Sequence, residues 1–370
     1  MAALPDIRDW ELDEFMEAEN LIIAKDELIL VTGATGFIGS KVVDSLLRRG
    51  FRNIRCFARP SSAESSVKRL SRSSQAGTRI EVVRGNLLSA EDCAAAVQGA
   101  AVIIHLAAGT GTKSFPEAYL NSVVTTRNLL EATRREQSVK RFVNVSSFAI
   151  YRNRENPAGK MVDERSPIES DPEVRGNAYC YAKVRQDEIV AEYGKKYGIP
   201  YVIVRPGYVY GGDRVTIPSR VGISTFGIFL HLGGPNPVPL TYIDNCAEAI
   251  ALIGIRKLET EGEVFNVVDD DLPSSRRFLR LYKRKVKPFS SIYLPHAASY
   301  GLCWLWEWYS KRSEGQLAPV FNRSVWHAQW KKARYSNAKL KNQLGWAPAV
   351  PTAEALNRYF ESCRSENQHD

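Results

Sequence analysis

Residues 28–39 constrain the fold more than any other segment of the chain. An aliphatic run over 28–32 ends in glycines at positions 33, 36 and 39, and apolar residues then recur at helical spacing. A strand, a glycine turn and a helix start together form a typical binding place for a dinucleotide pyrophosphate. Glycine lets the backbone approach the phosphates, and the helix N-terminus presents unpaired N–H groups. The segment therefore predicts the first unit of a dinucleotide-binding α/β sheet.

Strand-like and helical segments alternate beyond this turn. The expected strands are 28–32, 53–58, 80–84, 101–106, 141–146 and 201–205. The expected helices are 37–49, 90–98, 116–136 and 178–197, with a loop and weak helix over 60–77. The strands are too apolar to expose one face to water, which favours a parallel sheet covered on both sides. The predicted fold class is α/β, a Rossmann-type doubly wound parallel sheet with a smaller C-terminal lobe.

The composition changes after Gly211, where glycine and proline cluster up to residue 239 and indicate long loops and short elements. A helix over 244–257 and a strand over 263–268 are expected to follow. The expected divisions are an N-terminal extension (1–26), a dinucleotide-binding Rossmann domain (27–210), a mainly substrate-binding lobe with some elements returning to the sheet (211–362) and a tail (363–370). Ligands of open α/β sheets bind beyond the carboxyl ends of the strands, so the lobe would close over the cofactor and select the substrate.

The composition is ordinary for a globular protein of 370 residues, with 44% hydrophobic and 25% charged residues. The net charge of +9 suits anionic ligands. Nucleic acid is not an expected partner, because the chain has no basic repeat, zinc-finger spacing or RNA-binding aromatic motif. Six cysteines without a C-x-x-C pair predict no metal site and no disulfide framework, and indicate reduced thiols in the cytoplasm. We expect neither a secretory signal nor a membrane-spanning segment.

Tyr179 and Lys183 stand one helical turn apart on one face of the helix expected over 178–197. A nearby cation lowers the pKa of a tyrosine, so that the phenol can exchange a proton with a substrate hydroxyl or carbonyl near neutral pH. The strand ending at Ser147 supplies hydroxyl groups that could bind a substrate oxygen. Because the motif is short, the alternative is that Tyr179 and Lys183 form a surface pair on a helix without a catalytic role.

With these motifs the chain resembles the extended short-chain dehydrogenases/reductases, the NAD-dependent epimerase/dehydratase family that includes nucleotide-sugar epimerases. The likeness covers roughly residues 27–270, with weaker support to about 360. The matching motifs are 32–39, 105–108, Asn121 with 128–132, 146–151, 204–211 and 241–249.

The resemblance implies that Tyr179 is the acid/base and that Lys183 activates it and binds ribose. It implies Ser147 as the catalytic serine, because Ser147 lies four residues before Tyr151, with Ser146 as the alternative. The cofactor contacts expected on this basis are Gly33, Thr35, Gly36, Phe37, Ile38, Gly39, Arg59, Asn86, Leu87, Leu106, Ala107, Ala108, Asn121, Tyr179, Lys183 and Pro206. The candidate substrate contacts are Ser147, Tyr208, Arg214 and Arg220.

The expected cofactor is a nicotinamide dinucleotide, and NADP is favoured over NAD. NAD selection usually needs an acid after the second strand, whereas Arg59 in that place suits a 2′-phosphate. The alternative is that Arg59 stacks on adenine while NAD binds. Asn86 stands where the family often has an aspartate, so the adenine contact differs from the family pattern.

Hydride transfer without elimination of water is the expected chemistry. Family dehydratases carry an acid pair after the strand-end hydroxyl, whereas Phe148 and Ala149 follow Ser147 here. The first hypothesis is a nucleotide-sugar epimerase or reductase. The second is an enzyme resembling 3β-hydroxysteroid dehydrogenases, for which the apolar stretch 221–230 would line the pocket. A regulatory protein that binds NAD(P) without catalysis is the third reading.

The tryptophan-rich segment 297–312 allows two interpretations. Trp304 and Trp308 share a helical face, Trp306 points elsewhere, and basic residues flank the segment. Tryptophans bordered by cations fit a helix lying on an anionic membrane surface. The same pattern arises when a lobe helix packs on its domain with a charged outer edge. Family members are often dimers, so a homodimer is a further expected partner state.

Overall fold

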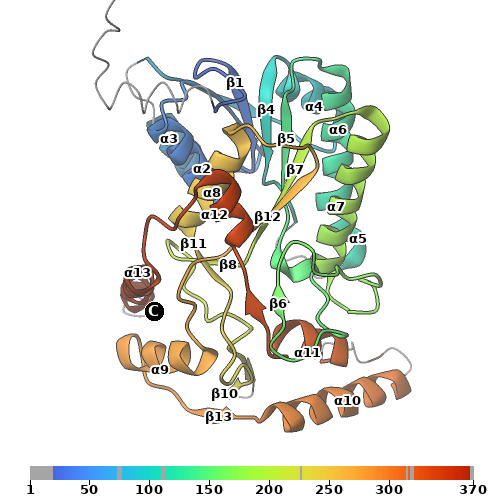
Figure 1. The fold of residues 1–370 in the computed structure, drawn as a ribbon, viewed down its shortest axis with the longest axis vertical. Helices are drawn as coiled ribbons and strands as arrows, with labels where there is room; N and C mark the ends of the chain where they lie inside the picture. The colour runs from blue at the N-terminus through green and yellow to red at the C-terminus, as the bar shows by residue number, and fades with distance from the viewer. Residues whose placement is uncertain are drawn as a thin grey trace, which may run out of the picture.

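The computed structural model describes residues 20–72, 77–109, 114–225, 227–313, 316 and 321–366. Its centre is a seven-stranded sheet in the order β12-β7-β5-β4-β1-β2-β3, in which every pair of neighbours is parallel (Figure 1). The strands are β1 (Leu28–Thr32), β2 (Asn53–Ala58), β3 (Arg79–Arg84), β4 (Ala100–His105), β5 (Arg141–Val145), β7 (Tyr201–Pro206) and β12 (Glu263–Val267). The predicted doubly wound α/β sheet is confirmed.

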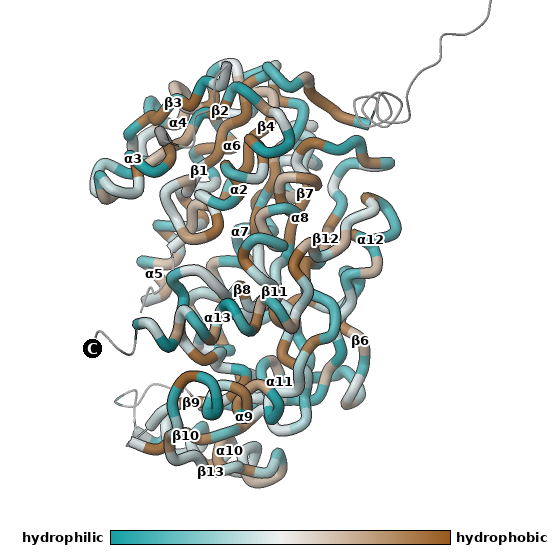
Figure 2. The backbone as a smooth tube through the Cα atoms, turned by 90° about the vertical axis from the view of Figure 1, so that its left-hand side faces the viewer, coloured by the Kyte–Doolittle hydropathy of each residue, from teal (hydrophilic) through white to brown (hydrophobic). Residues whose placement is uncertain are grey.

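Helices cover both faces of the sheet because each central strand sends alternate side chains to opposite sides. Ile29 and Val31 enter one core, together with α2 (Phe37–Arg48) and α8 (Ile243–Ile255). Leu30 enters the other core, which it shares with three helices. These are α4 (Ala90–Val97), α6 (Thr125–Arg135) and α7 (Ala178–Tyr197). In Figure 2 the hydrophobic colouring can be followed along β7.

The predicted strands agree with the structure to within a residue at each end, and α7 spans the predicted residues 178–197. The weak helix expected within 60–77 is α3 (Glu64–Arg72). Of the expected extension, residues 1–19 lie outside the described residues, while Ile22 donates a backbone hydrogen bond to Ile255 at the end of α8.

The prediction of one regular α-helix over 116–136 is wrong, because the helix is interrupted. It consists of α5 (Phe115–Ala118), a π-helical turn η1 (Tyr119–Val124) and α6. The hydroxyl of Thr125 donates to the carbonyls of Asn121 and Ser122, and that of Thr126 donates to the Ser122 carbonyl. Threonine hydroxyls that bond to preceding carbonyls compete with the regular amide pattern, which accounts for the wider turn. Such turns occur often at functional sites.

The lobe follows β7 directly. Its strands are β8 (Tyr208–Tyr210), paired with β11 (Leu240–Tyr242), and the three-stranded set β9 (Gly222–Thr225), β10 (Ile228–His231) and β13 (Ser291–Tyr293). β6 (Met161–Val162) pairs with β14 (Arg334–Tyr335). The remaining α-helices of the described residues are α9 (Ser275–Lys285), α10 (His296–Arg312), α11 (Arg323–Gln329), α12 (Ala338–Leu344) and α13 (Thr352–Glu366).

The short strands within 211–239 agree with the long loops and short elements expected there. Both α8 and β12 lie where a helix and a strand were predicted. β12 joins the sheet beside β7. α13 runs to Glu366, past the start of the expected tail, and residues 367–370 lie outside the described residues.

None of the helices in the described part of the chain is long and apolar enough to cross a membrane.

Candidate active site

The glycine turn after β1 is so tight that two of its positions exclude a side chain. Gly33 has a φ of 70°, and a Cβ added there would lie 3.0 Å from the amide nitrogen of Ala107. A Cβ added at Gly39 would lie 2.1 Å from the carbonyl oxygen of Gly33, closer than any real contact. Gly33 thus lets the turn pass beside the end of β4, and Gly39 lets α2 start against the turn.

This geometry fits a dinucleotide pyrophosphate. Gly36 caps α2 without a side-chain hydrogen bond, and the first turn of the helix contains no acidic residue. The positive end of the helix dipole is therefore available to an anion. Thr35, Phe37 and Ile38 complete the turn, and Leu106 contacts it from the end of β4.

The three candidate catalytic side chains converge at the carboxyl end of β5. The side chain of Asn177 caps α7 by accepting from the amide of Cys180, which starts the helix just before Tyr179. Ser147, which follows β5, lies close enough to Tyr179 for its hydroxyl to lower the pKa of the phenol. The buried Lys183 donates to the carbonyl of Val145, at 2.7 Å. The structure thus brings Ser147, Tyr179 and Lys183 together.

Burial shifts the pKa values of Tyr179 and Lys183 in opposite directions. Burial raises the pKa of Tyr179, while the nearby hydroxyl of Ser147 and the charge of Arg214 oppose that rise. Burial lowers the pKa of Lys183 to about 8, and the carboxylate of Asp187 opposes that shift. Lys183 is therefore mostly cationic at neutral pH. The cation that lowers the pKa of Tyr179 is Arg214. The prediction that Lys183 has this role is therefore not supported by the electrostatics of the site.

Arg214 reaches this site from the lobe. It follows Gly211 and Gly212, whose φ values of 102° and 55° turn the chain back after β8. Its guanidinium carbon lies 4.9 Å from the ring centroid of Phe37, in the glycine turn. Arg214 is exposed, so its charge remains available to a ligand between the glycine turn and Tyr179.

Lys183 is also held by a chain of buried polar groups that starts at the glycine turn. His105 bonds through Nδ1 to the Thr32 hydroxyl at 2.7 Å and through Nε2 to the Thr126 hydroxyl at 2.8 Å. Gln186 donates to the Thr126 hydroxyl and accepts from Lys183, both at 2.8 Å. Burial lowers the pKa of His105 to about 3, so the imidazole stays neutral and positions its neighbours.

A second buried network lies behind Lys183 on α7. Asp187 accepts from the Asn144 amide at 2.8 Å and pairs with Arg205 at 3.2 Å. Arg205 also donates to the hydroxyl of Tyr151, which donates to the Asn266 side chain. These buried groups were not among the residues predicted from the sequence. The signal for Asp187 was its position, because 179, 183 and 187 share one helical face.

The residues expected on the adenosine side lie around β2 and β3. Arg59 is exposed just after β2, and no carboxylate among the described residues forms an ion pair with it. The hydroxyl of Ser62, in the same loop, lies 3.3 Å from that of Thr35 in the glycine turn. Asn86 accepts from the Leu88 amide, and Leu87 is buried.

The remaining predicted residues differ in their surroundings. Asn121 lies half-buried in η1, Ala108 follows β4, and Pro206 ends β7. The hydroxyl of Tyr208 lies 3.1 Å from that of Thr216. Arg220 donates to the carbonyl of Ala328 and to the hydroxyl of Tyr335.

Comparison with known proteins identifies the family of the chain. Residues 29–267 match the NAD dependent epimerase/dehydratase family. An uncharacterised UDP-glucose epimerase of Bacillus subtilis (strain 168) is 30% identical over 254 residues, which are 65% of this chain and 76% of that protein. The 3beta-hydroxysteroid-dehydrogenase/decarboxylase isoform 1 of Arabidopsis thaliana is 24% identical over 361 residues, which are 92% of this chain and 81% of that protein.

The same fold occurs in the crystal structure of UDP-glucuronic acid 4-epimerase from Bacillus cereus in complex with UDP-glucuronic acid and NAD. The TM-score is 0.68 at 21% identity, over 92% of this chain and 99% of that chain. The matched segment begins in β1 and ends in β12, so it contains the glycine turn and all three candidate catalytic residues. The chain belongs to the NAD-dependent epimerase/dehydratase family.

Proposed function

We propose that the protein is an NAD(P)-dependent oxidoreductase that acts on a secondary alcohol or ketone through Ser147, Tyr179 and Lys183. The meeting of Ser147, Tyr179 and Lys183 at the carboxyl end of β5 carries this proposal. A nicotinamide dinucleotide, when bound, accepts and donates the hydride. The glycine turn and α2 would hold its pyrophosphate, with Lys183 and Asn121 toward the ribose and nicotinamide side.

Each catalytic residue has a defined task in this proposal. The phenolic oxygen of Tyr179 takes the proton from the substrate hydroxyl during oxidation and returns it during reduction. Ser147 donates a hydrogen bond that orients the same substrate oxygen. The charge of Arg214 stabilises the phenolate form of Tyr179, and Lys183 binds the ribose of the cofactor.

A nucleotide sugar is the substrate class that we favour. Arg214 is exposed, lies against Phe37 and acts on Tyr179, so an anionic group of the substrate could bind it beside the reacting carbon. An arginine offers two parallel N–H donors to a phosphate. The epimerases among the similar proteins agree with this class. Reduction or epimerisation is favoured over dehydration, because Phe148 and Ala149 occupy the positions of the dehydratase acids.

A 3β-hydroxysteroid-dehydrogenase-like activity is the second candidate. The similarity to the Arabidopsis enzyme extends over 92% of the chain and so includes most of the lobe. In the apolar stretch 221–230, however, Val221 and Phe229 are buried in the protein core. This packing leaves them less suited to line a pocket for an apolar alcohol.

NADP remains the favoured cofactor in this proposal. Arg59 is exposed beside the loop that contacts Thr35, where it could bind a 2′-phosphate. Mass spectrometry of nucleotide retained through purification would separate the two activities. Retained NAD would favour the epimerase, since an epimerase regenerates its cofactor within each cycle, and an empty site that takes up NADPH would favour the reductase.

The direct test is turnover of a panel of UDP-sugars by the Tyr179→Phe variant. We expect turnover to fall at least about a hundredfold, the usual contribution of an acid/base group. Tyr181→Phe is the matched control, because Tyr181 points to the rings of Phe115 and Tyr119. Near-normal turnover in Tyr179→Phe would refute the proposed role.

A further inference from the structure

Helix α10 exposes a cluster of large apolar side chains. They are Leu302, Trp304, Leu305, Trp308 and Tyr309, each between 43% and 55% exposed. The opposite side of the helix is packed, with Cys303 buried beside Trp326 and Trp306 against the ring of Phe321. Single exposed apolar residues are ordinary, but a contiguous set on one element marks an interaction surface.

β13 and α9 extend this cluster along one end of the molecule, at the bottom of Figure 1. β13 leads into α10 and exposes half of Ile292 and 41% of Tyr293. Lys283 of α9 donates to the Ser291 hydroxyl in β13, and the guanidinium of Arg276 lies 5.2 Å from the Tyr293 ring centroid. We call α9, β13 and α10 together the distal surface.

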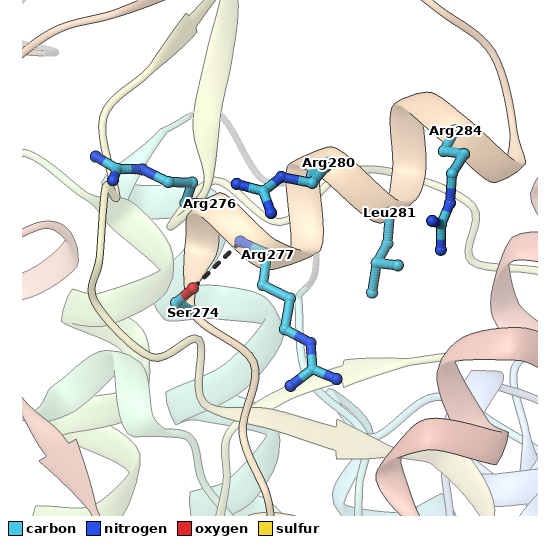
Figure 3. A pocket seen from close by; sticks show the side chains of 6 residues that line it. All are labelled: Ser274, Arg276, Arg277, Arg280, Leu281 and Arg284. Atoms are coloured by element: carbon cyan, nitrogen blue, oxygen red, sulfur yellow. Dashed lines mark hydrogen bonds between the residues drawn. The ribbon is translucent and has the colours of Figure 1, made fainter.

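The α9 part of the distal surface is strongly basic. Arg276, Arg277, Arg280 and Arg284 line a pocket of about 330 Å³ together with Ser274 and Leu281 (Figure 3). All four arginines are exposed, and no carboxylate of the described residues forms an ion pair with any of them. Several unpaired cations around one pocket attract phosphate groups.

The α10 part also places cations beside its aromatic rings. The side chain of Lys311 is 73% exposed, and the guanidinium of Arg312 lies 4.2 Å from the ring centroid of Trp308. Glu307 is the one acidic residue of α10, and its largely buried carboxylate pairs with Arg323 and, at 3.3 Å, with Lys311. The outer face of α10 therefore combines apolar and cationic groups without a negative charge of its own.

We propose that the distal surface docks onto an anionic lipid bilayer. The apolar side chains of α10 enter the headgroup–acyl boundary, and the α9 arginines bind lipid phosphates. Charge complementarity selects this occupant over a second copy of the chain. A two-fold dimer through the same surface would bring two sets of unpaired arginines together, which is unfavourable. The inference is independent of the proposed catalytic function, because no residue of the distal surface belongs to the catalytic site.

The test is sedimentation of the full chain with vesicles of phosphatidylcholine alone or mixed with phosphatidylglycerol. We expect at least about a tenfold higher affinity for the anionic vesicles, decreasing with salt. Arg280→Glu with Arg284→Glu should abolish this difference. The control is Lys68→Glu with Arg135→Glu, which makes an equal charge change at exposed sites of α3 and α6. This control should keep most of the preference for anionic vesicles.

A second arm probes the apolar part. We expect Trp304→Ser with Trp308→Ser to lose vesicle binding, whereas Val174→Ser, at another exposed apolar residue, should retain it. In the unchanged protein, brominated lipid should quench tryptophan fluorescence, an outcome that does not depend on how any variant folds. Equal binding to both vesicle types, or unquenched fluorescence, would overturn the proposal. So would light scattering that showed a dimer dissociated by the tryptophan substitutions, since the surface would then join two copies.

Discussion

The sheet and the distal surface hold their charged side chains in opposite ways. Around Lys183 the charges are buried and paired, as in the contact between Asp187 and Arg205. On the distal surface the arginines of α9 are exposed without acidic partners among the described residues, next to exposed tryptophans. A buried charge is tolerated only when it is paired, whereas an exposed cation is satisfied by water until a partner arrives. Substitutions should therefore affect folding in the first region and association in the second.

The largest effect is expected from Asp187→Ala. This change leaves Arg205 buried without its counter-ion, and breaking such a pair costs about 3–5 kcal/mol. Glu188→Ala is the matched control, because the neighbouring Glu188 pairs with Arg185 at the surface. Its cost should stay below about 1 kcal/mol. Urea unfolding of both variants makes the comparison, and equal costs would show that the buried pair does not stabilise the sheet.

The pH dependence of stability should reveal the burial of Lys183. Its folded pKa of about 8 lies below its ordinary value of 10.5, so between these pH values the unfolded chain binds more protons. The contribution of Lys183 to stability should therefore increase as pH rises from about 8 to 10.5, by up to about 3 kcal/mol. Urea unfolding of the cofactor-free protein and of Lys183→Met across this range isolates the effect. A constant difference between the two would contradict it.

A smaller effect, on cofactor affinity, is expected at Arg59. This residue is an exposed cation of the Rossmann domain, and we expect the cofactor to provide its anionic partner. Arg59→Ala should weaken NADPH binding about tenfold, the loss of one charge-assisted hydrogen bond, and leave NADH binding nearly unchanged. Fluorescence titration with both reduced cofactors measures the two affinities. Equal losses would remove the basis of the NADP preference.

The smallest effect on folding is expected at Trp304. The side chain is 51% exposed, so Trp304→Ala should change the free energy of unfolding by no more than about 0.5 kcal/mol. The same substitution at Trp330, which is 2% exposed, should cost about 3–5 kcal/mol. Thermal unfolding monitored by circular dichroism compares them. A similar loss in both would mean that Trp304 contributes to the lobe core rather than to a docking surface.

The strands and α7 could be predicted because local patterns determine them. The central strands β1, β4, β5 and β7 are buried and mostly apolar, and the side chain of Asn177 caps the start of α7. The turn η1 escaped prediction because the hydroxyls of Thr125 and Thr126 change the backbone pattern without changing the apolar spacing.

The candidate site was predictable only in part, because some of its contacts join distant segments. Tyr179 and Lys183 share one helix, so their spacing was readable. The placement of Arg214 depends on how the lobe folds back to Phe37, and Arg220 meets partners more than 100 residues away, at Ala328 and Tyr335. No local pattern in the sequence distinguishes these two arginines.

The most direct test of the account is a crystal structure of the protein with a nicotinamide dinucleotide bound. We expect the pyrophosphate at the N-terminus of α2 and the nicotinamide ring beside the phenolic oxygen of Tyr179. A ring bound far from that oxygen, with Tyr179 enclosed by other side chains, would contradict the proposed chemistry.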